Sequence, residues 1–376
     1  MNILIFSWRG PGHPHSGGAE QSSHEHAVGW YKAGHKVTLF TSFFKGAKKE
    51  EYVNGIRVIR RGGQVFQVHL HAIFWYLFFP HPKYDIVVDE VHGIPFFTPF
   101  FVRAKKLVFI HEVAKEVWKL NPWPRPFNLI PALIGTLLEP LIFKLIYLKI
   151  PFMTVSRSTK KDLIGWDIPE ENIVVIHNGF SNKPPVRQVK KEDKKTIIYL
   201  GALSKDKGIE EALKIFKLLF KTGKNWQFWV AGKGEPHYLK YLKRQVKEFG
   251  IEQAIKFFGF VSEREKYDLL SRAHILMNPS FREGWGLVVI EAASVGTPTI
   301  AYDVAGLRDS VQDGKTGLLS LPDPQNCVEK IRYLFQNEKL YCLLQKNCIK
   351  WSKKFSWEKS SRQSLNLVEK LTGKKD

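Results

Sequence analysis

The stretch that decides the fold is NPSFREGWGLVVIEAASVGTPTIAYDVAGLRDSV, residues 278–311. It follows a short apolar run at 275–277, passes through a glycine-containing loop, and shows a helical pattern over 286–295 before the next apolar run at 298–301. A strand, a loop, a helix and a strand in this order are typical of an α/β unit with parallel strands. The stretch therefore predicts the α/β fold class.

The same alternation continues along the whole chain. We expect strands at 2–7, 36–41, 56–60, 85–89, 107–110, 152–155, 173–176, 196–200, 226–231, 255–258, 275–277 and 298–301. We expect helices at 18–33, 130–148, 158–164, 207–221, 236–248, 263–271, 286–295, 325–336 and 357–371. Because single cores seldom grow beyond about 250–300 residues, a chain of this length predicts two domains. Each half has the pattern of a Rossmann-like sheet.

The segment SNKPPVRQVKKEDKK, residues 181–195, separates the two halves. Adjacent prolines and a dense charge run without apolar periodicity are typical of a linker. We therefore expect an N-terminal domain at 1–180, a C-terminal domain at 196–356, and a last helix at about 357–376. Two such sheets would hold a ligand in the cleft between them, near the carboxyl ends of their strands.

The composition limits the compartment and the partners. The formal net charge is +21, and the three cysteines contain no CxxC pair, which favours a reducing compartment. No basic segment followed by a long apolar stretch opens the chain, so we expect no signal peptide and a cytoplasmic protein. The positive charge favours nucleic acid, an anionic bilayer or phosphorylated substrates. Nucleic acid is disfavoured because no zinc-finger, RNP-like or basic heptad pattern is present.

Two apolar stretches, 65–79 and 127–150, bear on membrane contact. Pro131, Glu139, Pro140 and Lys144 interrupt the second stretch, which argues against a membrane-spanning helix. We expect both stretches to form helices that face the core. The alternative is a surface that leans into one leaflet of an anionic membrane, with Trp75, Tyr76 and basic side chains at the interface.

The segment PGHPHSGGAEQSSHEH, residues 11–26, follows the first expected strand. Gly17 and Gly18 lie where that strand gives way to a helix, so backbone N–H groups there can face an anion. Its four histidines raise the question of a metal, but His24 and His26 are two residues apart and point to different helix faces. We expect no metal here. A tight turn without any ligand is the alternative.

Two glutamates of the opening stretch, Glu283 and Glu291, suggest a binding site for a sugar and a phosphate. A helix beginning near Gly286 would direct its first N–H groups at a phosphate, beside Glu283 in the preceding loop. A carboxylate near a phosphate is costly unless it binds hydroxyls or a cation, so the two acids suggest a polyol. Glu291 would accept ribose hydroxyls, as acidic residues do in dinucleotide folds. A surface glutamate is the alternative for Glu291.

Two shorter pieces, YLGALSKDKG at 199–208 and WVAGKGEP at 229–236, complete a recognisable set. With them the chain resembles the retaining glycosyltransferases of family 4, which have the GT-B fold. The resemblance covers nearly the whole chain, and the E-x7-E segment with EAASVGTPTIA is its most specific part. It implies two Rossmann-like domains that face each other across a cleft, with the last helix crossing back onto the first domain.

The family implies transfer of a sugar from a nucleotide-sugar donor, with retained anomeric configuration and with neither metal nor cofactor. The catalytic positions it implies are Glu283 at the donor-sugar hydroxyls, Lys207 at the diphosphate, and His111 at a sugar hydroxyl or the developing positive charge. Further donor contacts are implied for the backbone of Gly286 and Leu287 at the diphosphate, Val261 and Ser262 at the base, Glu291 at the ribose, and Gly17 and Gly18 at the donor phosphate and the acceptor.

The chain departs from the family pattern at Ala202, where the family commonly has an arginine that clamps the diphosphate. One clamp on the diphosphate is therefore either missing or supplied elsewhere, for example by Lys205 or Lys233, although an ammonium group does not reproduce a bidentate guanidinium. His111-Glu112 and His177-Asn178-Gly179 also stand where the family often has His-Asp and Pro-Asn-Gly.

We therefore expect a retaining hexosyltransferase that uses a nucleotide-sugar to extend a glycan or lipid-linked acceptor in cell-surface polysaccharide synthesis. We expect a cytoplasmic protein without nucleic acid, and peripheral contact with the inner face of the cell membrane is the alternative that the two apolar stretches leave open. A nucleotide-sugar epimerase of the same fold is the alternative from another enzyme class. A basic module that binds nucleic acid or membrane is the third.

Overall fold

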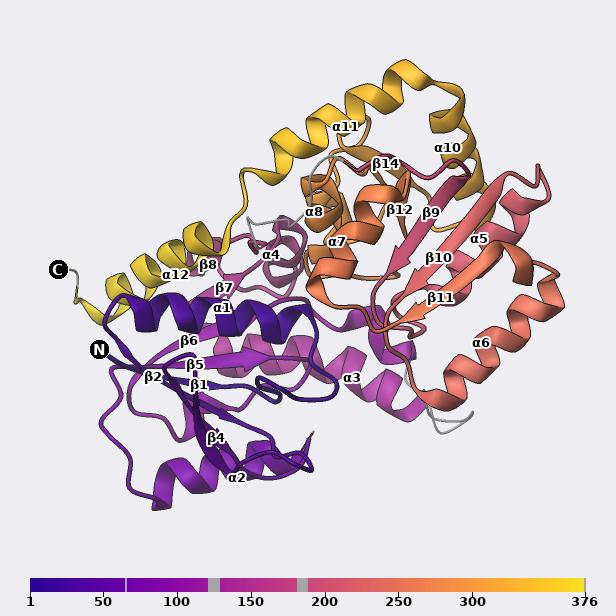
Figure 1. The fold of residues 1–376 in the computed structure, drawn as a ribbon. Coiled ribbons are helices and arrows are strands. Elements are labelled where there is room, and N and C mark those ends of the chain that lie inside the picture. The colour runs from indigo at the N-terminus through magenta and orange to yellow at the C-terminus, as the bar shows by residue number, and fades with distance from the viewer. Residues whose placement is uncertain (65, 121–128, 181–188, 375–376) are drawn as a thin grey trace. The chain divides into compact units, whose positions relative to one another are not determined.

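The computed structural model describes residues 1–64, 66–120, 129–180 and 189–374 (Figure 1). The chain forms two compact units. Unit 1 comprises Met1–Gly179 together with Ser356–Asp376, and unit 2 comprises Phe180–Phe355. Of the expected linker, residues 181–188 lie outside the described residues, and Lys195 already begins the first strand of unit 2.

Unit 1 is built on an eight-stranded sheet of order β3-β4-β2-β1-β5-β6-β7-β8. Its strands are β1 Asn2–Phe6, β2 Lys36–Thr41, β3 Glu50–Val53, β4 Ile56–Arg60, β5 Ile86–Val91, β6 Lys105–Ile110, β7 Phe152–Thr154 and β8 Ile173–Val175. All neighbours pair in parallel except β3 with β4, and Ile3 on β1 pairs with Val37 on β2 and with Ile86 on β5. The runs of buried aliphatic residues in β1 and β5 fit strands covered on both faces.

Helices cover both faces of this sheet. They are α1 Gly18–Lys32, α2 Phe66–Phe78, α3 Leu129–Ile142, α4 Arg157–Ile164 and α12 Trp357–Thr372, with short helical segments η1 Thr98–Phe100, η2 Lys115–Leu120, η3 Phe143–Tyr147 and η4 Glu170–Asn172. Val87 of β5 packs with α2, and Val91 of the same strand packs with η3, which continues α3. Since residues four apart on a strand share a face, α2 and α3 lie in one layer, opposite α1 and α12 (Figure 1).

The last helix, α12, is part of unit 1 and packs on α1. Gly29 makes this close approach possible, because a Cβ there would lie 2.3 Å from the Cβ of Ser361. Ser364 of α12 bonds two side chains of α1, His26 through Nδ1 at 2.8 Å and Trp30 through Nε1 at 2.9 Å. These buried hydrogen bonds fix the register of the two helices.

The apolar helices α2 and α3 correct the expectation that both face the core. On α2, Val68, Ala72 and Trp75 are buried. The opposite side exposes more than half of five large apolar side chains: Phe66, Leu70, Phe74, Leu77 and Phe78. On α3 a similar face is exposed by Leu129, Ile130, Leu133, Ile134, Leu137, Leu138 and Leu141. Both helices are apolar on nearly every side, but the sheet can cover only one stripe of each. No helix in the described part of the chain is both long and apolar enough to cross a bilayer.

Unit 2 contains a six-stranded parallel sheet of order β11-β10-β9-β12-β13-β14. Its strands are β9 Lys195–Leu200, β10 Trp226–Ala231, β11 Ile255–Gly259, β12 Ile275–Asn278, β13 Thr299–Tyr302 and β14 Gly317–Ser320. Its helices are α5 Ile209–Phe220, α6 Pro236–Phe249, η5 Glu252–Ala254, α7 Glu263–Arg272, α8 Leu287–Ser294, α9 Leu307–Ser310, α10 Pro324–Gln336 and α11 Glu338–Ser352. Ile197 and Ile198 of β9 point to opposite faces, the first toward α5, α6 and α10 and the second toward α7 and α8.

Candidate active site

Glycines draw three loops together at the carboxyl edge of the unit 2 sheet. Gly208, with φ +71°, lies so close to the next loop that a Cβ would be 2.0 Å from the carbonyl oxygen of Pro279. Gly306, with φ +79°, would place a Cβ 2.0 Å from the carbonyl oxygen of Glu283. Both positions require glycine for backbone conformation and for space. The loop that carries Glu283 is therefore held between the loops after β9 and β13.

Within this arrangement Glu283 and Lys207 meet as an ion pair. Nζ of Lys207 lies 3.2 Å from Oε2 of Glu283, and Ser280 Oγ donates to Oε1 at 3.0 Å. Both side chains remain partly exposed, at 26% for Lys207 and 17% for Glu283. A carboxylate that accepts from hydroxyls and an ammonium group that attracts phosphate thus stand side by side.

The loop ends at the amino terminus of α8. Gly286 is the N-cap residue and has φ +78°, and Leu287 is the first residue of the helix. Trp285 is buried beside Phe355, which anchors the peptide just before the helix. The first N–H groups of a helix carry a partial positive charge and have no partner within the helix. The backbone N–H groups at Gly286 and Leu287 therefore lie at a helix start of the kind that binds phosphate in other proteins.

Glu291 lies further along α8 and is buried, which excludes the alternative of a surface glutamate. Nζ of Lys266 on α7 donates a hydrogen bond to Oε1 of Glu291 at 2.6 Å, and the same Nζ lies 2.7 Å from Oε1 of Glu263. Burial raises the pKa of the Glu291 carboxyl, and the charge of Lys266 opposes that rise. Oε2 has no hydrogen-bond partner among the described residues, so one carboxylate oxygen is left for a ligand. Sequence reasoning missed Lys266.

The residues expected to hold the base lie where β11 leads into α7. Ser262 caps α7, and both its backbone N–H and its hydroxyl bond Oε2 of Glu265, at 2.8 and 2.7 Å. Because the Ser262 amide is taken, a base would have to use the backbone of Val261. Phe260 next to it is 70% exposed, and Nζ of Lys233 lies 4.0 Å from its ring centroid. Sequence reasoning missed this exposed aromatic ring.

The position of the missing arginine is open to solvent. Ala202 is exposed, and its carbonyl oxygen accepts a hydrogen bond from Tyr199 Oη at 2.7 Å. Of the two lysines expected to compensate, Lys205 is exposed and Lys233 lies over the Phe260 ring. The ammonium group that the structure brings to Glu283 is that of Lys207.

In unit 1, Gly17 and Gly18 are exposed at the amino end of α1. The Gly17 N–H donates to Oε2 of Glu20 at 2.7 Å, and Arg9 lies 3.6 Å from Oε1 of the same glutamate. The Gly17 N–H, which was expected to face a ligand, is therefore bonded to Glu20. Gly17 and Gly18 have no Cβ atoms, so no side chains cover the loop at these positions. The loop permits close approach of a ligand there.

The four histidines of the first loop do not gather around a metal. His13 Nδ1 accepts from the backbone N–H of His15 at 3.1 Å, His24 bonds Asn54 at 3.0 Å, and His26 bonds Ser364. The rings of His13, His24 and His26 thus bond three different segments of unit 1. Among the described residues, the group of histidines and acids with ligand atoms close together is a different one, made of Glu90, His92 and His111.

His111 belongs to this buried group, which sequence reasoning missed. Its Nε2 lies 3.2 Å from Oε1 of Glu90, and Nε2 of His92 lies 3.1 Å from the same oxygen. Ser23 of α1 donates to that oxygen as well, at 2.5 Å. Glu90 is the next-to-last residue of β5, His92 follows that strand and His111 follows β6, so the group forms at the carboxyl edge of the sheet. The sequence did not reveal the group, because folding brings His111 from the end of β6 and Ser23 from α1 to the end of β5.

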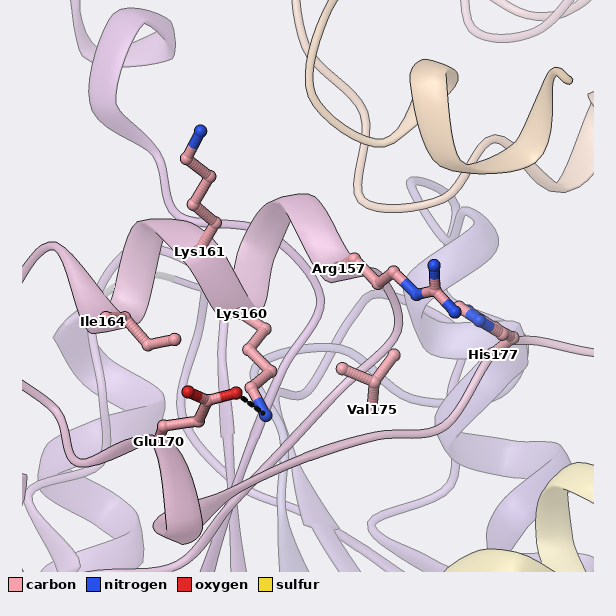
Figure 2. Close-up of a pocket in the computed structure, with 7 residues that line it drawn as sticks. All are labelled: Arg157, Lys160, Lys161, Ile164, Glu170, Val175 and His177. Carbon is pink, nitrogen blue, oxygen red and sulfur yellow. Dashed lines mark ion pairs between the residues drawn. The ribbon is translucent and has the colours of Figure 1, made fainter.

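A shallow hollow also lies on unit 1, where β7 and β8 end beside α4 (Figure 2). Its lining is Arg157, Lys160, Lys161, Ile164, Glu170, Val175 and His177. Lys160 pairs with Glu170 at 3.1 Å, and Figure 2 shows Lys161 directed away from that pair. The lining is more basic than acidic, in keeping with the charge of the chain.

Comparison with known proteins decides the family. The family described as "Glycosyltransferase Family 4" matches residues 16–182, and "Glycosyl transferases group 1" matches residues 182–354. The chain is a glycosyltransferase of family 4. The motifs around Glu283 and the Gly17–Gly18 loop lie within the matched ranges.

Curated relatives match this glycosyltransferase over part of their length. An uncharacterized glycosyltransferase of Methanocaldococcus jannaschii is 24% identical over 58% of this chain and 59% of its own. The glycogen synthase of Mycobacterium tuberculosis is 30% identical over 43% of this chain and 38% of its own. The D-inositol 3-phosphate glycosyltransferase of a Nocardioides species is 31% identical over 34% and 30%. The chain thus spans less than two thirds of each of these relatives.

Solved structures share the whole fold of this glycosyltransferase. Sucrose-phosphate synthase from Thermosynechococcus elongatus superposes with a TM-score of 0.80 at 19% identity, covering all of both chains. HepE from Anabaena, solved with UDP and glucose, gives 0.72 at 18% identity over 98% of this chain and all of its own. WaaG, a glycosyltransferase of lipopolysaccharide biosynthesis, gives 0.74 at 14% identity over 97% and 99%. The fold is therefore GT-B, with two Rossmann-like parallel-sheet units.

Proposed function

We propose that this glycosyltransferase transfers a hexosyl-type sugar from a nucleotide-sugar to a hydroxyl of a glycan or lipid-linked acceptor, with retention of the anomeric configuration and without a metal. The observation that carries the proposal is the pairing of Glu283 with Lys207 beside the amino end of α8. The carboxylate suits sugar hydroxyls, and the ammonium and helix amides suit a diphosphate.

The proposed step exchanges one bond to the anomeric carbon for another. The bond from that carbon to the diphosphate oxygen breaks, and a bond to the acceptor oxygen forms on the same face. The departing phosphate oxygen takes the acceptor's proton. Lys207 and the amides of Gly286 and Leu287 stabilise the negative charge that grows on the leaving group. Glu283 holds the sugar hydroxyls, and no side chain is assigned as a nucleophile.

Support for the ribose contact comes from Glu291. Its Oε1 is held by Lys266 at 2.6 Å, which fixes the carboxylate and leaves Oε2 for a hydroxyl. A buried carboxylate is stable only when it is paired and hydrogen-bonded. The ion pair with Lys266 thus keeps Glu291 charged without a ligand and oriented for one.

The first experiment screens UDP-, GDP- and ADP-sugars by thermal shift, and then follows product formation by NMR with a hydroxyl acceptor. We expect one donor class to raise the melting temperature and the product to keep the donor's anomeric configuration, in the presence of EDTA. An inverted product, or activity lost with EDTA and restored by Mg²⁺, contradicts the proposal. Incubation with the donor alone distinguishes the transferase from the alternative, a nucleotide-sugar epimerase, because only an epimerase would produce an epimerised nucleotide-sugar without an acceptor.

We further propose that the acceptor lies at an anionic membrane, as in cell-surface glycan synthesis. The support is the layer of unit 1 formed by α2 and α3, where apolar side chains such as Phe74 and Phe78 are exposed. Neither helix carries an exposed acidic residue, since the one glutamate of α3, Glu139, is buried. The exposed Arg103 lies next to Tyr76 of α2 and supplies positive charge at the margin. Trp75, expected at the interface, is buried instead.

Liposome flotation tests the membrane contact. The protein should float with vesicles that contain anionic lipid and less so with zwitterionic vesicles, because apolar insertion and headgroup attraction add. The double variant Phe74→Ser/Phe78→Ser should lose most of the floated fraction. Tyr333→Ser, which removes a half-exposed aromatic ring from α10 of unit 2, is the matched control and should float normally. Protein that stays entirely in the soluble fraction contradicts the membrane contact.

A further inference from the structure

The group at the carboxyl edge of unit 1 contains a histidine to which the resemblance gives no role. His92 follows β5, and its ring is stacked between Trp8 at 5.4 Å and His111 at 5.5 Å between centroids. Its side chain is 15% exposed, whereas Glu90 beneath it is fully buried. His92 is thus the member of the group that reaches toward solvent.

The hydrogen bonds of the group orient this ring. Nε2 of His92 bonds Oε1 of Glu90 at 3.1 Å, so that nitrogen carries the proton as donor. Nδ1 of His111 is buried without a hydrogen-bond partner in the structure, whereas Nδ1 of His92 is not among such buried, unpartnered atoms, and the His92 side chain is partly exposed. With Nε2 committed to Glu90, His92 has Nδ1 left for a ligand. An imidazole whose inner nitrogen is held by a carboxylate is oriented for use at its outer one.

The charges around His92 decide which ligand suits it. Burial disfavours the charged ring, but hydrogen bonding and charge from Glu90, helped by Glu20 of α1, raise the pKa of His92, while Arg9 opposes the rise. Burial alone would raise the pKa of Glu90, yet its bonds to His111 and His92 lower it well below the ordinary value. The pKa of His26, a neighbour on α1, is lowered by burial to about 3, so that ring adds no charge. The carboxylate of Glu90 thus favours the protonated form of the His92 ring.

We propose that His92 is a substrate-contacting residue, oriented by Glu90 through Nε2, that donates Nδ1–H to a phosphate oxygen of a substrate. The inference deepens the proposed sugar transfer and rests on it. A phosphate reaches this edge either in the diphosphate of the donor or in a phosphate-linked acceptor. Ser23 of α1 and His92 both donate to Glu90, so the carboxylate links the His92 ring to α1. The exposed Gly17–Gly18 end of α1 is a second feature of unit 1 that favours an anion.

The first test reads the ring directly and needs no turnover. In the ¹⁵N-labelled full chain, inorganic pyrophosphate should shift the Nδ1 resonance of His92 in a saturable manner. The variant Glu90→Gln should lower the pKa of His92, because burial then acts without the opposing carboxylate. A role of Glu90 in packing alone would leave that pKa in place. An unshifted Nδ1 resonance at saturating pyrophosphate overturns the inference, and it does so whether or not sugar transfer occurs.

The second test uses His92→Gln, with His237→Gln as the matched control because His237 is an exposed histidine on α6. If the donor supplies the phosphate, calorimetry should show affinity for the nucleoside diphosphate falling about tenfold, the scale of one charge-assisted hydrogen bond. If the acceptor supplies it, that affinity stays and the acceptor KM rises about tenfold. No change in either value overturns the inference. Stoichiometric zinc in the purified protein that is lost in His92→Gln would overturn it as well, since the group would then be a metal site.

Discussion

The two carboxyl edges of this glycosyltransferase are built in different ways. In unit 2, Lys207, Glu283 and Gly286 come from loops whose sequence motifs are short and continuous, and glycines such as Gly208 press these loops together. In unit 1, Glu90, His92 and His111 come from the ends of two strands, and Ser23 of α1 completes their hydrogen bonds. One edge pairs cations with acids near the surface, and the other buries a carboxylate under two imidazoles.

The difference in exposure between these charged groups determines how each edge can act on a substrate. The pair of Lys207 and Glu283 is partly exposed, so a ligand can separate its charges and use both. The pair of Lys266 and Glu291 and the group around Glu90 are buried, so their charges are fixed in place before any ligand arrives. We expect exposed pairs to govern turnover and buried groups to govern stability and orientation.

Lys207→Ala should have the largest effect. Removing the ammonium group leaves the growing charge of the diphosphate without its main side-chain donor, so kcat should fall roughly ten- to thousand-fold. Steady-state kinetics with the donor found by screening measures the change. Lys214→Ala removes another ion-paired lysine, on α5, and serves as the control that should keep activity. Equal activity in the two variants would remove Lys207 from the site.

Lys266→Met tests the buried pair. Without the ammonium group Glu291 is an unpaired buried acid, and the variant should lose about 3 kcal/mol of unfolding free energy at neutral pH. The folded-state pKa of Glu291 is raised, so the folded protein holds that proton more tightly than the unfolded chain. The loss should therefore shrink as the pH falls from 7 toward the carboxyl range. Chemical denaturation across that range measures it, and a deficit independent of pH would show that the charge of Glu291 is not its cause.

Glu283→Gln should separate binding from transfer. The amide retains the shape of the carboxylate but loses its charge, so turnover should fall about tenfold while affinity for the nucleoside diphosphate changes little. Kinetics and calorimetry on the same preparation give the two values. A parallel loss of both would place Glu283 at the diphosphate instead of the sugar.

Sequence patterns predicted the fold and the unit 2 edge more fully than the unit 1 edge. All the expected strands are present, because buried parallel strands are continuous apolar runs. Edge strands β3 and β14 and helix α11 were missed, since each is short or mixes polar with apolar residues. Periodicity also could not tell that α2 leaves Phe66 and Phe78 in solvent, because a helix that is apolar all round shows no preferred side.

The site residues also differ in how far the sequence could predict them. Glu283, Glu291 and Gly286 lie within one continuous segment, so their spacing in the sequence is enough to group them. Lys266 and Glu90 act through contacts made by folding, with Lys266 25 residues from Glu291 and Glu90 67 residues from Ser23. Nothing local marks such partners, because the strand order and the packing of α7 and α1 bring them together.

A crystal structure with an intact nucleotide-sugar tests the central assignment most directly. We predict donor-sugar hydroxyls within hydrogen-bond reach of Glu283, the diphosphate against Lys207 and the first amides of α8, and a ribose hydroxyl on Oε2 of Glu291. A donor bound elsewhere, or bound at this edge of unit 2 with both carboxylates turned away from it, would contradict the assignment.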